Sequence, residues 1–243
     1  MHTRRQFGVA VLGVAALALL LAGTGRADAG FKMMLSDSLD GASVTIADNG
    51  PGDLNPAVGA ITFSGTVGEF AINVSSGLSK PILGSPSVPD MTLSSLNTKL
   101  TGSAADTLTI KLTDTDFVPF SGLGTLTTTA GGTLAGSVTS MKVQAFLDPT
   151  NTEFGTLGPG AQLTFSTSPF SGSSSVGVGP LTAPYSLTIV DTITAGAGAG
   201  SINFAHDVEV IPIPEPASLT LLSLGALGLL GYGWRKRRQA AEA

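Results

Sequence analysis

Short runs of alternating apolar and polar residues, separated by glycine and proline, fill the middle of this chain. In "DTLTIKLTD" (106–114), for example, Leu108, Ile110 and Leu112 alternate with polar residues. Because successive side chains of a strand point to opposite faces of a sheet, such runs predict half-buried β-strands. We count about ten to twelve of them between residues 30 and 211, without a sustained helical period. The sequence therefore predicts an all-β body, an antiparallel β-sandwich that is jelly-roll-like.

Three stretches lack the alternation and predict loops. Leu83–Asp90 and Ser168–Pro184 are rich in proline, glycine and serine. The stretch "TAGAGAGS" (Thr194–Ser201) predicts a flexible loop or a glycine-weakened hairpin.

Charge and cysteine content exclude several classes of function. Residues 30–213 contain five lysines and fourteen acidic residues, a net charge of −9. Such a body repels phosphate backbones, so we expect no nucleic acid as a partner. The chain has no cysteine, which excludes disulfides, thiolate metal sites and cysteine nucleophiles.

The first 29 residues have the three parts of a secretory signal peptide. A basic start, "MHTRRQ", precedes an apolar run, and Ala27 and Ala29 form an A-x-A cleavage site. We expect cleavage after Ala29, so that the exported body (30–211) begins at Gly30. "TRRQF" also resembles a twin-arginine motif, but the strongly apolar run favours the general secretory translocon. An uncleaved membrane anchor is the alternative.

The C-terminus contains a second apolar segment. An uncharged run, Ala217–Gly233, is followed by a basic cluster and a short end, residues 239–243. The length of the run predicts one transmembrane helix. Basic residues beside such a helix stay in the cytoplasm, so the body would lie outside it. The basic cluster consists of Arg235, Lys236, Arg237 and Arg238.

The segment before this helix contains Pro214, Glu215 and Pro216, in a stiff proline-rich spacer. Pro-Glu-Pro, an apolar helix and a basic cluster in this order resemble the PEP-CTERM sorting signal, over residues 212–238. The resemblance implies recognition and processing by an exosortase, a membrane protease or transpeptidase. It also implies a Gram-negative host that makes extracellular polysaccharide. A plain tail anchor is the alternative.

Catalytic residues are not predicted. His206 is the single histidine of the body; with Asp207 as its strand neighbour it forms no triad, and an exposed or edge-strand position is expected. Asp114 and Asp116 are spaced to lie on one strand face or in one turn, and they could by accident have the separation of about 5–9.5 Å that a glycosidase pair requires. The body offers few aromatic residues for a sugar cleft, so hydrolase activity is not favoured.

One loop, "ADNGPGDLNPAVG", concentrates oxygen donors. Asp48, Asn49, Asp53 and Asn55 are therefore candidate calcium ligands, although their spacing does not match an EF-hand. The alternative is a tight loop in which the same side chains cap turns.

These features predict a non-enzymatic exported protein, first held at the inner membrane by its tail and then displayed at the cell surface or in the extracellular matrix. It would serve a biofilm or exopolysaccharide matrix by structure or adhesion, with extracellular polysaccharide as a candidate partner. The first alternative is a secreted, calcium-dependent carbohydrate-binding or carbohydrate-active domain. The second is a permanently tail-anchored inner-membrane protein that faces the periplasm.

Overall fold

The computed structural model describes residues 30–213 and 217–241; residues 1–29, 214–216 and 242–243 lie outside the described part. The described chain contains ten β-strands and one helix, and its strand pairs are antiparallel. The prediction of an all-β, antiparallel body of about ten strands is confirmed. The strands are β1 (Lys32–Asp37), β2 (Ser43–Ala47), β3 (Ala60–Val67), β4 (Phe70–Leu78), β5 (Asp90–Leu100), β6 (Asp106–Phe117), β7 (Gly124–Asp148), β8 (Gly160–Phe165), β9 (Phe170–Val178) and β10 (Tyr185–Pro212), and the helix is α2 (Ala217–Ala241).

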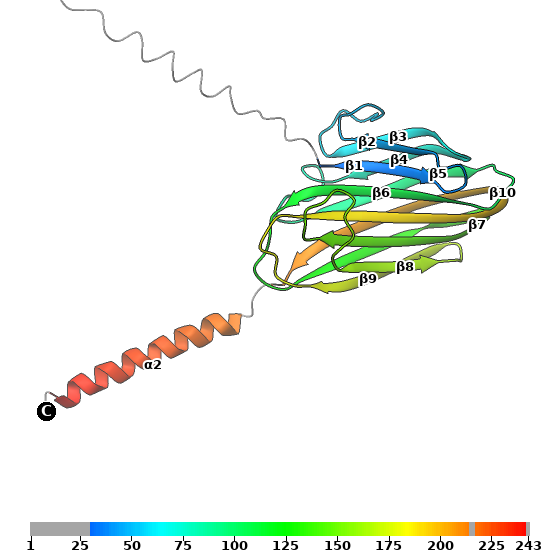
Figure 1. The fold of residues 1–243 in the computed structure, drawn as a ribbon. Helices are drawn as coiled ribbons and strands as arrows, with labels where there is room; N and C mark the ends of the chain where they lie inside the picture. Colours follow the sequence, from blue (N-terminus) through cyan, green and yellow to red (C-terminus); the bar gives the residue numbers. More distant parts are fainter. Residues whose placement is uncertain (1–29, 214–216, 242–243) are drawn as a thin grey trace, which may run out of the picture.

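The ten strands form one sheet, and two long strands, β7 and β10, divide it into two layers (Figure 1). In one layer, residues 185–195 of β10 pair with β6 and with residues 138–148 of β7, and the order is β2-β1-β6-β10-β7-β8. In the other layer, residues 200–209 of β10 pair with β5, and residues 200–212 pair with residues 124–136 of β7. The order of this layer is β3-β4-β5-β10-β7-β9. Both long strands therefore belong to both layers.

The glycine-rich stretch Thr194–Ser201 is the corner at which β10 passes from one layer to the other. The expectation of a loop or a hairpin was wrong, because the strand continues through it. Between the pairs Ala195↔Val138 and Gly200↔Gly136, the register of β10 against β7 shifts. Gly136 and Gly198 have φ angles of +63° and +103°, which glycine adopts at little cost. The glycines thus allow the two paired strands to bend together at this corner.

The second predicted loop, Ser168–Pro184, was also partly wrong. Residues 170–178 form β9, which pairs with β7 along its whole length. The apolar alternation fails there because the strand lies at the edge of its layer, and only Phe170 and Val178 are buried. The loop predicted over Leu83–Asp90 is confirmed up to Pro89, since β5 begins at Asp90.

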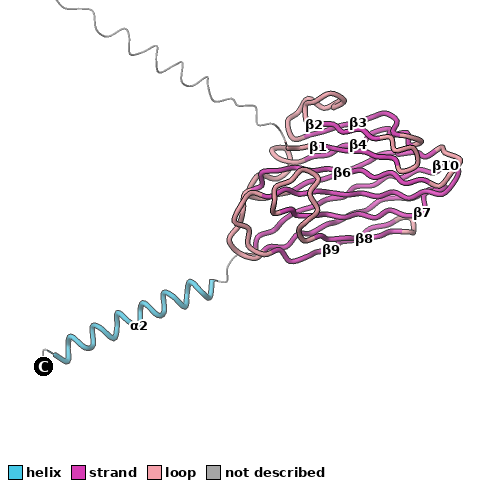
Figure 2. Tube along the Cα trace, in the orientation of Figure 1, coloured by secondary structure: helices cyan, strands magenta, loops and turns pink. Residues whose placement is uncertain are grey.

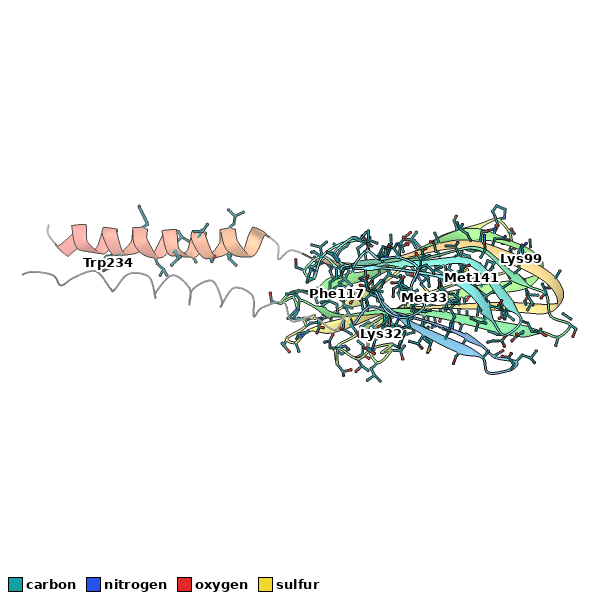
Figure 3. All side chains as sticks on the ribbon, turned by 90° about the horizontal axis from the view of Figure 1, so that it is seen from above. Lys32, Met33, Lys99, Phe117, Met141 and Trp234 are labelled. Atoms are coloured by element: carbon teal, nitrogen blue, oxygen red, sulfur yellow. The ribbon has the colours of Figure 1, made fainter. Side chains whose placement is uncertain are left out.

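The core lies between the two layers and follows the alternation of the strands. Leu108, Ile110 and Leu112 of β6 are fully buried, as are Met33 and Phe117. Figure 3 shows Met33 and Phe117 inside the body. Each such side chain stabilises the fold by roughly 1.5–3 kcal/mol through burial.

Helix α2 extends away from the strands (Figure 2). It begins one residue after Pro216, as expected for a helix that follows a proline-rich spacer. Leucines along it are exposed, among them Leu222 and Leu229. Among the residues that the structure describes, no helix is long and apolar enough to cross a membrane. The prediction of a transmembrane helix is therefore not confirmed.

Candidate functional site

A cavity of about 320 Å³ opens at the end of the sandwich where β1 begins. Its walls come from the start of β1, the β2–β3 loop, the β4–β5 loop and the end of β6. Its charged side chains are Asp48, Lys80, Asp114 and Asp116. The fold therefore joins one residue of the predicted calcium loop to the predicted carboxylate pair, a juxtaposition that the sequence alone does not indicate.

Asp114 is almost fully buried, and both of its oxygens accept hydrogen bonds. Ser79 Oγ donates to Oδ2 over 2.6 Å, and the backbone N–H of Thr115 donates to Oδ1 over 2.8 Å. Lys80 Nζ lies 2.7 Å from Oδ2 and 4.1 Å from the ring centroid of Phe117. These contacts stabilise the buried carboxylate and hold the β4–β5 loop against β6.

Asp116 also lies in β6, but it is exposed, whereas Asp114 is buried. Its φ angle is +62°, a conformation that aspartate tolerates better than most residues. Its backbone N–H donates to Asn151 Oδ1 over 2.8 Å, and Asn151 Nδ2 donates to Asp116 Oδ1 over 2.7 Å. The reciprocal pair holds the β7–β8 loop beside the cavity. A hydrolytic role for Asp114 and Asp116 stays untested.

The oxygen-rich β2–β3 loop is held by its own carboxylates. Asp53 Oδ2 accepts the N–H of Asn49, and Asp53 Oδ1 accepts the N–H groups of Asn55 and Thr62, each over 2.9 Å. These bonds are those of a side chain that caps a turn. Within residues 30–213 and 217–241, no group of three or more metal-ligating side chains is placed to hold a metal ion. Calcium binding by this loop stays a prediction.

Asp48 differs from Asp53 because it faces the cavity. Its Oδ2 accepts the N–H of Gly59 over 2.8 Å, and its Oδ1 accepts Asn49 Nδ2 over 3.1 Å. Burial raises the pKa of this carboxyl, and the charges of Asp53 and Asp114 raise it further, against the Gly59 hydrogen bond. Asp48 is thus a carboxylate in an environment that favours a nearby cation.

A second polar cluster lies inside the sandwich. His206 Nδ1 lies 2.6 Å from Asp191 Oδ1, and His206 Nε2 lies 2.5 Å from Thr128 Oγ1. All three side chains are 0% exposed. The order carboxylate, imidazole, hydroxyl is that of a catalytic triad. A solute has no access to these atoms in the folded sandwich, so the cluster serves the core.

The expectation for His206 was wrong, because this residue is buried on a central strand. Phe204, His206 and Val208 share one parity along β10 and all point inward, while Asp207 points outward. The alternation in the sequence indicates that His206 points inward. The sequence does not indicate that Asp191 is the partner of His206, because Asp191 lies in the half of β10 that belongs to the other layer. Burial raises the pKa of Asp191, and His206 acts against that shift.

The tail follows directly from the shared strand, since β10 ends at Pro212. Pro214, Glu215 and Pro216 lie outside the described residues, as do Ala27 and Ala29 of the predicted cleavage site. Helix α2 includes the positions of the basic cluster, Arg235–Arg238. Residues 212–238 match the family model for the PEP-CTERM protein-sorting motif.

The chain carries a PEP-CTERM sorting motif. The predicted resemblance is therefore confirmed over the same residues. A PEP-CTERM signal implies export to the cell envelope or surface, and such signals are recognised by exosortase. The match covers the tail, residues 212–238.

Comparisons of the body with known proteins are distant. No curated protein matches the chain in sequence. The adhesin domain of Epf from Streptococcus pyogenes is 8% identical at a TM-score of 0.34, covering 76% of this chain and 60% of that one. The CBM22-2 xylan-binding domain of Paenibacillus barcinonensis Xyn10C is 8% identical at a TM-score of 0.26, covering 61% and 94%. The enzymatically active domain of bacteriophage CBA120 tailspike protein 4 is 12% identical at a TM-score of 0.30, covering 60% and 19%. Likeness at this level carries no argument about function.

Proposed function

We propose that this PEP-CTERM protein is a non-enzymatic structural or adhesive component of the cell surface or extracellular matrix. Its exported sandwich would be held transiently at the inner membrane through the tail and then released by an exosortase. The observation that carries the proposal is the sorting motif at residues 212–238, joined directly to the end of β10.

The position of the junction supports processing there. Ile213 is the last described residue before the Pro-Glu-Pro, and its N–H donates to the carbonyl of Leu123 over 2.7 Å. The strand pairing of β10 ends at Pro212↔Gly124. A cut after Ile213 would therefore leave the pairs of β10 with β5, β6 and β7 intact, and the released body would keep its fold.

The polar groups of the body support a structural role. The triad-like cluster at His206 is sealed in the core, and the oxygens of Asp114 are bonded to Ser79, Lys80 and Thr115. A nucleophile or general base needs access to its substrate. These residues supply instead the polar contacts that hold loops and layers together.

Replacement of Pro214, Glu215 and Pro216 by alanine in the native host tests the proposal. We expect the wild-type protein to lose its tail and to accumulate at the surface or in the matrix, while the variant keeps its full mass and stays with the membrane fraction. Pro180→Ala, in the β9–β10 loop, is the matched control and should behave like wild type. If wild type and variant both kept the full tail and stayed with the membrane fraction, the sorting role would be refuted and a permanently tail-anchored protein favoured.

A second candidate function is calcium-dependent carbohydrate binding, for which the cavity at Asp48 is the candidate site. The cavity combines three carboxylates with the apolar side chain of Phe31. A calcium-dependent rise in melting temperature that Asp48→Ala abolishes, together with retention on a glycan array, would support this alternative. The absence of both effects would exclude it and leave the structural role.

A further inference from the structure

We propose that the cavity at Asp48 binds the α-ammonium group of the chain's own Gly30, formed when residues 1–29 are removed. The inference rests on the predicted export and on cleavage after Ala29. Hydrolysis of the Ala29–Gly30 peptide bond consumes one water, leaves a carboxylate on Ala29 and leaves an amine on Gly30. This amine binds a proton at neutral pH, so a positive charge appears where a neutral amide stood.

The strand register places Gly30 between the carboxylates. β1 pairs with β2 as Lys32↔Ala47 and with β6 as Lys32↔Thr113. The N–H of Asp48 donates to the carbonyl of Phe31 over 3.0 Å, which extends the first ladder by one residue. Continued by two residues, the second ladder sets Gly30 opposite Thr115. Gly30 therefore leaves the sheet with Asp48 on one side and the Asp114–Asp116 segment on the other.

Gly30 is fitted closely into this position. It lines the same cavity as Asp48, Asp114 and Asp116. A Cβ atom added to Gly30 would lie 1.9 Å from Thr115 Oγ1. No side chain fits at that distance without a shift of the β6 backbone or of Thr115. The first residue of the processed chain is thus held as an ordered wall of the cavity.

The charges around the cavity favour an added cation. Lys80 is engaged with Asp114, over 2.7 Å. Asp48 has no ion-pair partner among the described residues, and Asp53 and Asp114 act on it as repulsive neighbours. An ammonium at Gly30 would offset this repulsion and would add N–H donors for the carboxylates.

The direct test is the titration of the Gly30 amine in the chain 30–243, released from a fusion partner by a protease that leaves no extra residue. NMR of the isotopically labelled glycine follows the α-amino group. We expect its pKa to lie at least about one unit above the usual 7.7–8.0, because the carboxylates favour the charged form. A pKa within the usual range would overturn the proposal, whatever the fate of the tail.

A comparison of melting temperatures supplies the second readout. The chain that begins at Gly30 should melt about 2–4 °C above the same chain with Ala29 retained, and the difference should vanish in Asp48→Asn. Asp207→Asn, which removes a charge from the outer face of β10, should keep the difference. Equal melting temperatures for the two chains would overturn the proposal. If Asp48→Asn fails to fold, the titration of the wild-type chain still decides.

The native N-terminus provides the last check. Protein recovered from the host should begin at Gly30 by intact mass and by N-terminal sequencing. Any other first residue would overturn the inference, and it would leave the sorting function untouched, because that function is measured by the loss of the tail and by location.

Discussion

Replacement of His206 by leucine tests how much the buried cluster contributes to the sandwich. His206 links Asp191 of one layer to Thr128 of the other, and all three side chains are fully buried. The leucine fills a similar volume but leaves the Asp191 carboxylate without its partner. Breaking a buried pair in this way costs about 3–5 kcal/mol. That is a large part of the roughly 5–15 kcal/mol that stabilises a typical domain.

Urea unfolding followed by circular dichroism measures this loss. With an m-value of about 2 kcal/mol/M, the midpoint should fall by about 1.5–2.5 M. The double variant His206→Leu/Asp191→Val removes both partners and should recover most of the loss, since apolar replacement of a buried pair is often neutral. Asp207→Leu, the outward-facing neighbour, is the control and should stay within about 0.5 kcal/mol of wild type. A shift of the His206→Leu midpoint below about 0.5 M would refute the reasoning.

Two further predictions concern a charge and a corner. Burial raises the pKa of Asp90, and the charges of Glu209 and Asp207 raise it further. The contribution of Asp90 to stability is therefore present below about pH 4 and is lost as pH rises through the folded-state pKa. Asp90→Asn should therefore stabilise the protein by about 0.5 kcal/mol at pH 7 and lose this gain near pH 3.5; a pH-independent effect would contradict the assignment. Gly136→Ala places a Cβ 2.3 Å from a backbone oxygen, at a residue whose φ angle is +63°. Chemical unfolding should show a free energy of unfolding that is lower by at least about 1–2 kcal/mol. Gly177→Ala on β9 is the control and should be nearly neutral, because the space around Gly177 is open. Equal stabilities of these two variants would exclude the corner as a point of close packing.

Local alternation made most of the strands predictable. The runs around Ile46, Ile72, Ile110 and Leu163 all lie in strands, because each buries one face against the single core. The C-terminal half of β10, near residues 203–211, was also predictable up to the proline spacer, where the strand ends. The sequence thus predicts the alternation within each strand and the residues at which a strand ends.

The features that were missed depend on contacts distant in sequence. The bend at Gly198 looks like a loop in the chain because nothing local says that β7 bends beside it. Edge strand β9 carries polar residues because one of its sides has no partner strand. The meeting of Asp48 with Asp114 and the pair of His206 with Asp191 both follow from the register of strands far apart in the chain.

The place of β10 in the sandwich suits a protein that is handled through its C-terminal tail. Residues 200–209 pair with β5 on one side, and residues 200–212 pair with β7 on the other, up to the residue before Ile213. A pull on the tail along the strand therefore loads the ladder with β7 over residues 200–212 and the ladder with β5 over residues 200–209, whereas an edge strand would offer one ladder. The same strand continues into the opposite layer, where Asp191 is bonded to His206. The tail is thus attached to the strand with the most extensive pairing in the body, and processing at the tail leaves that pairing in place.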